Sequence, residues 1–196
     1  MKLPKTASCV VIGGVAVGLS VAYHLVRGGM VGVALLEKGL LGEGSTGACA
    51  GGVRLDYSSE VNVRFSLASM PRWETFGEEF GVDPGFRRVG YLMLAEKNEH
   101  WRILQDNRAL HERLRVPSEL LSPEEIKNRW PFIQTEGLLG GTYCGADGYV
   151  GPQEAVQGYA RSCRASGVRI FQGTTATGIR IEGTKVRAVE TEKGAI

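Results

Sequence analysis

Three glycines, Gly13, Gly14 and Gly18, follow a short apolar run, and Glu37 ends a second apolar run. A glycine-rich turn that opens a helix can hold a phosphate, because free N–H groups and the helix dipole favour an anion there. The dinucleotide form, G-x-G-x-x-G, needs glycines to turn the chain, to approach a pyrophosphate and to pack helix on strand. These places fall on Gly13, Val15 and Gly18. Glu37 lies 37 − 18 = 19 residues after Gly18, where a carboxylate can accept both ribose hydroxyls, so the spacing predicts a dinucleotide site with one glycine replaced.

The valine at position 15 is the departure from this pattern. Its branched side chain stands where a pyrophosphate would come closest, and overpacking of this kind costs about 1–3 kcal/mol. That cost corresponds to about a tenfold to hundredfold loss of affinity. The turn therefore predicts a weakened cradle, and a βαβ turn without a ligand is the alternative that the glycines leave open.

The elements that position these residues can be read from the apolar spacing. Residues 8–12 and 30–36 are short apolar runs typical of buried parallel strands. Residues 17–26 have helical spacing, and Gly28 and Gly29 follow as a helix stop with a left-handed cap. The three segments together predict a βαβ unit.

Turn residues and periodicity predict the remaining elements. Residues 39–52 carry six glycines and are expected to form a loop. Helices are expected at residues 59–76, capped by Ser59 and kinked or split by Pro71, at 98–115, from Ser122 onward with proline in its first turn, and at 152–167. Residues 77–85 are expected to form turns, 86–95 and 169–173 strands, 137–150 strand and loop, and 178–182 with 185–191 a hairpin.

The composition limits which partners, metal sites and locations are expected for the chain. Its 23 basic and 21 acidic residues give a net charge of +2 without a block of like charge, so no nucleic-acid partner is predicted. The four cysteines and three histidines are scattered, which predicts no metal site, reduced thiols and a cytoplasmic location. Residues 7–26 lack charged side chains, so a membrane anchor is an alternative, although glycines and His24 interrupt that run.

Four stretches resemble the FAD-dependent oxidoreductases that act on amino acids and N-methylated amines, a family that includes D-amino acid oxidase, glycine oxidase, sarcosine oxidase β subunits and dye-linked proline dehydrogenases. They are VVIGGVAVGLSVAYHL, ALLEKGLLGEGSTGACAGGVR, GVDPGFRRVGYLML and ADGYVGPQEAVQGYARSCRASGVRIFQGTTATGI. The second is the most specific, because a ribose-binding glutamate, G-S-T-G and a glycine-rich run into arginine follow one another. The resemblance implies an α/β fold, with a Rossmann-like βαβ FAD-binding domain and part of an α+β substrate domain.

The resemblance also implies the cofactor FAD and the residues that hold it. The pyrophosphate would lie over Gly13, Gly14, Val15, Ala16, Val17 and Gly18, and the adenosine ribose on Glu37 with Lys38 beside it. Ser45 and Thr46 would contact phosphate or ribityl groups, Gly51, Gly52 and Val53 would line the flavin, and the backbone near Ala176 would meet the adenine. Arg54 is implied beside the flavin, where it would hold a substrate carboxylate or polarise the ring, and a surface ion pair is the alternative for it.

The implied reaction is the oxidation of an amino acid, or of an N-methylated or secondary amine, by hydride transfer to the flavin, as in sarcosine oxidase and proline dehydrogenase. We expect residues 1–76 to form the FAD-binding βαβ part, 77–150 a substrate-domain insertion, and 151–196 a truncated return to the FAD-binding domain. Relatives are about twice this length, so a second chain or homo-oligomer and self-association through open edges are expected. A truncated, non-catalytic remnant or binding module of the same fold is the alternative, favoured by Val15; Gly151 is a second departure, where relatives often carry an acidic residue.

Overall fold

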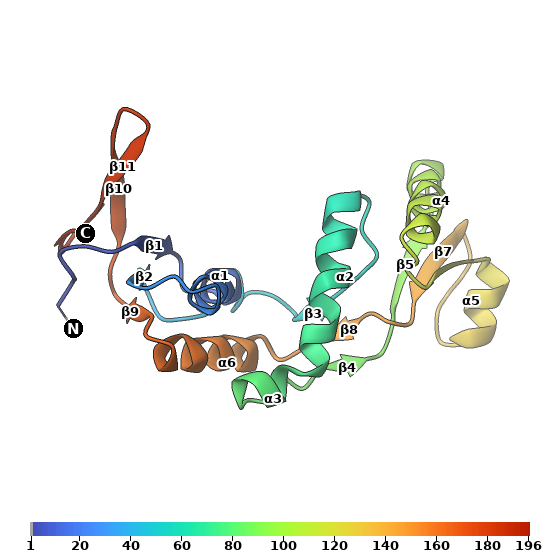
Figure 1. The fold of residues 1–196 in the computed structure, drawn as a ribbon. Helices are drawn as coiled ribbons and strands as arrows, with labels where there is room; N and C mark the ends of the chain where they lie inside the picture. The colour runs from blue at the N-terminus through green and yellow to red at the C-terminus, as the bar shows by residue number, and fades with distance from the viewer. Residues whose placement is uncertain (1) are drawn as a thin grey trace. The chain divides into compact units, whose positions relative to one another are not determined.

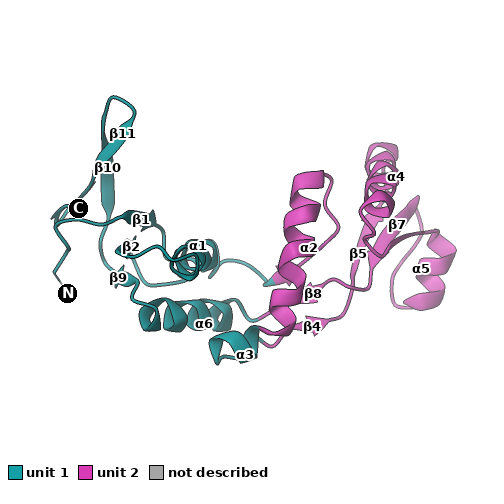
Figure 2. Ribbon diagram, in the orientation of Figure 1, with its two compact units in different colours: residues 1–51, 76–84, 151–196 teal, residues 52–75, 85–150 magenta. Residues whose placement is uncertain are grey.

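The computed structural model describes residues 2–196 and divides the chain into two compact units (Figure 1, Figure 2). The first unit comprises Met1–Gly51, Phe76–Pro84 and Gly151–Ile196, and the second comprises Gly52–Thr75 and Gly85–Val150. Residues 52–75 thus belong with the second unit and residues 76–84 with the first. The expected division at residues 76 and 150 stays a prediction.

The first unit is built on a three-stranded parallel sheet of β1 (Cys9–Ile12), β2 (Val33–Leu36) and β9 (Arg169–Phe171). β2 lies in the middle and pairs with β1 on one side and with β9 on the other. All four residues of β2 are buried, as expected for a central parallel strand. Helix α1 (Ala16–Arg27) connects β1 to β2, so the predicted βαβ unit and α/β class are confirmed.

Successive residues of a strand point to opposite faces of the sheet, so both faces carry side chains that can be buried. Each face of this sheet is covered by a different layer. α1 and α6 (Pro152–Ala165) pack against one another and against the sheet (Figure 1). The other face is covered by the antiparallel strands β10 (Ala176–Glu182), β11 (Lys185–Thr191) and β12 (Gly194–Ala195). A core there joins Leu36 and Phe171 to Val189 and Ile196. The predicted hairpin is confirmed, and its turn contains Gly183 with a φ of +62°.

The glycine pair after α1 ends that helix as predicted. Gly29 has a φ of +91° and donates its N–H to the carbonyl of Val26 at 2.9 Å, while Met30 donates to Leu25 at 3.0 Å. This pair of bonds is the Schellman arrangement, which satisfies carbonyls at the end of a helix. Residues 7–26, for which a membrane anchor was the alternative, thus contain β1 and most of α1 rather than one continuous apolar helix. In the part of the chain that the structure describes, no helix has the length and apolar character needed to cross a membrane.

Of residues 77–85, expected to form turns, residues 77–80 instead belong to a short helix, α3 (Phe76–Phe80), and residues 81–85 lie outside helices and strands. Phe76 and Phe80 are buried one helical turn apart, with ring centroids 5.3 and 4.6 Å from that of Tyr159 in α6. A Cβ at Gly158 would lie only 2.5 Å from the Phe76 ring, so the missing side chain makes room for it. Tertiary packing of aromatic rings thus outweighs the turn propensity of the glycines in this segment.

The second unit holds two small antiparallel sheets and three helices. One sheet has the order β3 (Gly52–Val53), β8 (Gly148–Tyr149), β4 (Arg87–Arg88), and the other β5 (Tyr91–Ala95), β7 (Gly140–Cys144), β6 (Ser118–Leu121). The helices are α2 (Glu60–Glu74), α4 (Asn98–Arg113) and α5 (Pro123–Arg129). Leu55, Val63, Met70, Val116 and Cys144 form its core.

Several local predictions for this unit can be compared with its structure. Ser59 caps α2 through the N–H of Asn62, and Ser122 caps α5 in a full capping box with Glu125. The expected split at Pro71 is wrong, because α2 continues through it to Glu74. The single strand expected at residues 86–95 is two strands, since Gly90 between them has a φ of +77°. β6 was not expected from the sequence.

Candidate functional site

The glycine turn of the first unit is shaped by Gly13 and Gly18. Gly13 has a φ of +109°, and its N–H donates to the carbonyl of Leu36 at 2.8 Å, which ties the turn to the end of β2. A Cβ at Gly18 would lie 1.9 Å from the carbonyl oxygen of Gly13, a distance that no side chain can occupy. Gly18 therefore lets α1 start directly against the turn, which is the packing role that the dinucleotide pattern assigns to its last glycine.

Gly14, the glycine outside the expected spacing, is required by Glu37. Its N–H donates to Glu37 Oε2 at 2.6 Å, and the N–H of Gly39 donates to Oε1 at 2.8 Å. A Cβ at Gly14 would lie 2.8 Å from Glu37 Cβ and 2.5 Å from Leu41 Cδ2. Only 9 % of the Glu37 surface is exposed, so these two N–H groups hold its carboxylate in a fixed place at the end of β2.

Val15 and the loop that follows β2 meet at the start of α1. Val15 is the extended residue before the helix, and the N–H of Ala16 donates to Thr46 Oγ1 at 3.1 Å. A Cβ at Gly44 would lie 3.1 Å from Val15 Cγ1, so the valine side chain lies against the glycine loop. Val17 is 73 % exposed, and Lys38 and Ser45 are exposed as well. The structure thus brings Thr46 and the glycine loop to the N-terminus of α1, with Val15 packed against the loop.

The connection from β9 to β10 also lies beside Glu37. The N–H of Thr174 donates to the carbonyl of Glu37 at 2.9 Å, and the N–H of Leu41 donates to Gln172 Oε1 at 2.9 Å. Ala176, predicted to face the adenine, begins β10 two residues after Thr174. Sequence reasoning missed Gln172, Thr174 and Leu41. Their place in the sequence could have indicated them, because they follow two predicted parallel strands, whose carboxyl ends meet at one edge of a sheet.

This arrangement fits the phosphate and ribose groups of a dinucleotide. The first turn of α1 presents N–H groups at the positive end of the helix dipole, beside a backbone that Gly13 and Gly18 keep close to the sheet. A buried carboxylate at the end of the second strand matches the ribose-binding position. The fold and this site define a dinucleotide-binding α/β protein.

In the second unit, Arg54 follows the glycines that were predicted to line a flavin. Its guanidinium carbon lies 5.3 Å from the centroid of the Tyr57 ring and 5.0 Å from that of the Tyr91 ring. Both distances allow cation–π attraction, which holds the arginine between two aromatic rings. Arg54 and Tyr57 line a cavity of about 210 Å³ together with Gly52, Val53, Phe65, Ser66, Ser69 and Trp73. The cavity offers one positive charge among aromatic and hydroxyl groups, a suitable environment for a small carboxylate.

The segment that follows Arg54 is bonded to a set of buried polar side chains, which we call the buried polar cluster: Asp56, His111, Thr142 and Asp147. Thr142 Oγ1 donates to Asp56 Oδ2 at 3.0 Å, and Asp147 Oδ1 accepts the N–H of Leu55 at 2.8 Å. His111 Nε2 lies 2.9 Å from the carbonyl oxygen of Tyr57 and 3.5 Å from Asp56 Oδ1. Because a carbonyl only accepts, Nε2 carries a proton. The sequence does not predict these contacts, because they join residues far apart along the chain.

Burial changes the acid–base properties of this region. It raises the pKa of Asp147, against the lowering effects of the Leu55 N–H, the Cys144 thiol and the positive charge of Arg54. Burial, with the negative charge of Asp147 beside it, raises the pKa of the Cys144 thiol to about 12. Cys144 is therefore a protonated thiol at neutral pH.

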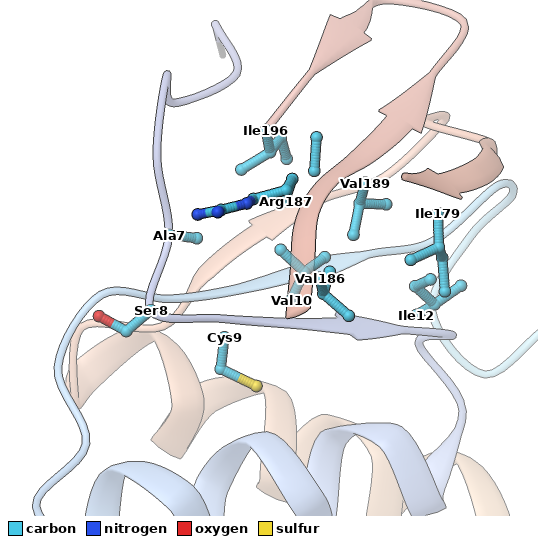
Figure 3. Close-up of a pocket in the computed structure, with 11 residues that line it drawn as sticks. Ala7, Ser8, Cys9, Val10, Ile12, Ile179, Val186, Arg187, Val189 and Ile196 are labelled. Carbon is cyan, nitrogen blue, oxygen red and sulfur yellow. The ribbon is translucent and has the colours of Figure 1, made fainter. Parts of the chain in front are cut away.

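A cavity of about 350 Å³ in the first unit has a different character (Figure 3). It lies between β1 and the β10–β11 hairpin, and Val10, Ile12, Ile179 and Val186 contribute apolar side chains to it. Ile12, Ile179 and Val186 are each about half exposed or more. The cavity is thus lined mainly by apolar side chains and lies on the face of the sheet opposite α1, with Ser8 and Arg187 as polar side chains in its lining.

Comparison with known proteins gives the same class. Residues 8–196 match the model of the FAD dependent oxidoreductase family, and the chain belongs to that family. The resemblance found in the sequence is thereby confirmed.

Three relatives illustrate the range of the family. The solved structure of L-proline dehydrogenase from P. horikoshii has a TM-score of 0.86 and 32% identity, covering 99% of this chain and 51% of that chain. The sarcosine oxidase subunit beta of Rhodobacter capsulatus is 28% identical, over 98% of this chain and 48% of its own length. The mitochondrial pyruvate dehydrogenase phosphatase regulatory subunit of Mus musculus is 31% identical, over 99% of this chain and 22% of its own length. The chain therefore spans between about a fifth and about half of these relatives.

Proposed function

We propose that this chain is the FAD-binding part of an oxidoreductase that oxidises an amino acid, or an N-methylated or secondary amine. The observation that carries the proposal is the buried carboxylate of Glu37, held by the Gly14 N–H beside the start of α1. Membership of the FAD dependent oxidoreductase family supports FAD as the dinucleotide. The names of two relatives, a proline dehydrogenase and a sarcosine oxidase subunit, support the substrate class.

In this proposal the first unit holds FAD through its backbone. The pyrophosphate would lie over the N–H groups of residues 13–18, with Thr46, which already caps Ala16, and Ser45 close by. Glu37 would accept the ribose hydroxyls, with Lys38 beside it, and Ala176 would meet the adenine. The side chain of Val15 would reduce the room for the pyrophosphate, because its Cγ1 already lies close to the glycine loop.

The second unit would hold the substrate. When bound, the flavin supplies the hydride acceptor of the reaction, with Gly51, Gly52 and Val53 along its ring. Arg54 would bind the carboxylate of the amino acid by a charge-assisted hydrogen bond. Its two flanking rings would limit the directions in which the guanidinium points and would keep water from it.

A non-catalytic binding module of the same fold is the second candidate function. One relative of this chain carries the name of a regulatory subunit, so membership of the family does not by itself require catalysis. Val15 also favours this candidate, since it weakens the expected pyrophosphate contact.

A second chain or a second copy would cover the apolar cavity beside β1. The sarcosine oxidase relative is named as a subunit, which supports an assembly, and Ile12, Ile179 and Val186 expose apolar surface. Sedimentation velocity should therefore show self-association, and replacing Ile179 and Val186 by lysine should reduce it. A compact parent monomer at all concentrations contradicts this part of the proposal.

The decisive experiment is the visible absorption spectrum of the purified chain, before and after addition of FAD and desalting. Val15→Gly should bind FAD about tenfold to hundredfold more tightly than the parent. Val21→Gly, which removes the same side chain from an exposed position six residues further along, within α1, should not tighten binding. Flavin retained by the parent supports a working cofactor domain; flavin retained by neither the parent nor Val15→Gly contradicts FAD binding by this chain.

A further inference from the structure

We propose that Asp147 is the positioning residue of Arg54: it fixes both aromatic rings that hold the guanidinium. The inference rests on the proposed function, in which Arg54 binds a substrate carboxylate. It assigns a role to a residue that touches neither the substrate nor the flavin in that proposal.

The first argument is that three successive residues after Arg54 are held by hydrogen bonds, Leu55 and Tyr57 through the backbone and Asp56 through its side chain. The Leu55 N–H donates to Asp147 Oδ1 at 2.8 Å, and the Asp56 carboxylate accepts from Thr142 Oγ1 at 3.0 Å. The Tyr57 carbonyl accepts from His111 Nε2 at 2.9 Å. A segment without helix or strand structure thus has a fixed path, and that path sets the direction in which the Tyr57 ring leaves the backbone.

The second argument is that Asp147 also reaches the other ring. Its backbone carbonyl accepts the N–H of Gly90 at 2.9 Å, and Gly90 directly precedes Tyr91 at the start of β5. A Cβ at Gly90 would lie 2.2 Å from the hydroxyl oxygen of Tyr143 and 2.3 Å from Cε2 of its ring, so Tyr143 packs directly on this turn. Asp147 is therefore bonded next to both walls of the arginine site, through its side chain on one side and its backbone on the other.

The third argument is the free-energy cost of burying the Asp147 carboxylate. Asp147 is fully buried, and its Oδ2 has no hydrogen-bond partner among the described residues. A buried carboxylate is expensive unless its bonds are used. An arrangement in which Oδ1 holds the Leu55 N–H and Arg54 lies nearby accounts for its presence here.

The test uses proton NMR of the Arg54 side chain in the full chain. Protons that lie over aromatic rings shift upfield, so the parent should show shifted Arg54 signals that Tyr57→Leu or Tyr91→Leu reduces. Asp147→Ala should remove the part of the shift that comes from the Tyr57 ring and expose the Leu55 amide to faster hydrogen exchange, because it removes the side-chain acceptor but leaves the backbone bond to Gly90. Asp147→Asn keeps an acceptor for Leu55 and should restore both signals. Asp106→Ala, the same change at an exposed site on α4, should leave them unchanged.

Should Asp147→Ala fail to fold, Asp147→Ser, which shortens the acceptor but stays polar, takes its place in the same comparison with Asp147→Asn. Retention of the full parent shift in Asp147→Ala, or in Asp147→Ser where it replaces that variant, overturns the inference. So does a parent whose Arg54 signals show no ring shift at all.

A titration with L-proline separates this inference from the proposed function. Asp147→Ala should weaken L-proline binding by about threefold to tenfold, because an unordered arginine must be immobilised on binding. If Arg54→Gln binds L-proline as the parent does, the carboxylate role of Arg54 is wrong, while the NMR comparison still decides whether Asp147 positions its side chain. If Arg54→Gln loses binding and Asp147→Ala does not, the positioning role is wrong.

Discussion

The glycine turn of the first unit and the Arg54 site of the second are built in opposite ways. In the turn, backbone N–H groups make the polar contacts. Gly14 and Gly18 are needed there because a side chain at either position would clash with its neighbours. Around Arg54, side chains make the polar contacts, between partners that lie 54 to 92 residues apart along the chain. A site made of backbone is sensitive to added atoms, whereas a site made of buried side chains is sensitive to removed ones.

The largest expected effect comes from adding one carbon to the turn. Gly18→Ala places a Cβ 1.9 Å from the carbonyl oxygen of Gly13, which cannot move without disturbing β1 and β2. We expect a loss of about 3 kcal/mol or more in the free energy of unfolding, measured by urea denaturation. Gly178→Ala, whose Cβ would meet only Glu190 Cβ at 3.9 Å, should change stability by less than about 1 kcal/mol. Equal effects would show that the turn can relax.

In the second unit, we expect the loss of stability to come from removing buried side-chain atoms. Asp56→Ala leaves the Thr142 hydroxyl and the His111 ring without their carboxylate, and should cost about 2–3 kcal/mol. Glu119→Ala removes a carboxylate from the exposed ion pair with Arg129 and should cost less than about 1 kcal/mol. The comparison is made by thermal and urea unfolding, and a loss for Asp56→Ala no greater than for Glu119→Ala would refute the importance of the buried polar cluster.

The pH dependence of Asp147 sharpens the comparison further. Burial raises the pKa of Asp147 above its ordinary value of 3.8, so the folded state binds this proton more tightly than the unfolded state. Its contribution to stability is therefore present below pH 3.8 and is lost as the pH rises through the raised pKa. Asp147→Asn does not titrate, so its stability relative to the parent should increase as the pH rises from 4 to 7 in urea unfolding experiments. A constant difference over that range would contradict the raised pKa.

The smallest effect is on cysteine reactivity and concerns no stability at all. Cys49 is exposed in the glycine loop, whereas burial raises the pKa of Cys144 to about 12 and of Cys163 to about 11. At pH 8 a thiol reagent should label Cys49 quickly and reach Cys144 and Cys163 only on unfolding, because the thiolate is the reactive form. Mass spectrometry of peptides gives the order of labelling; early modification of Cys144 would contradict its burial.

The same contrast explains how far the sequence could predict this molecule. The βαβ unit, the capped helices at Ser59 and Ser122 and the hairpin at Gly183 follow from local spacing, and the structure confirms them. Gly14 seemed out of register because its reason is a contact with Glu37, 23 residues away. The buried polar cluster could not be predicted, since aspartate, histidine and threonine in a single sequence are typical of the surface, and only tertiary contacts show them paired inside.

The discontinuous first unit also has a consequence for the time course of synthesis. Residues 52–75 and 85–150 complete the second unit when Val150 emerges from the ribosome, whereas β9, the third strand beside β2, begins only at Arg169. β1 and β2 are thus made early, whereas β9 pairs with β2 late, since Ala34 and Arg169 lie 169 − 34 = 135 residues apart. Such non-local parallel pairing is a slow step. The second unit can therefore fold before the first is fully synthesised. Until β9 is made, apolar residues of β1 and β2 stay incompletely covered, so we expect this interval to carry the greatest risk of aggregation.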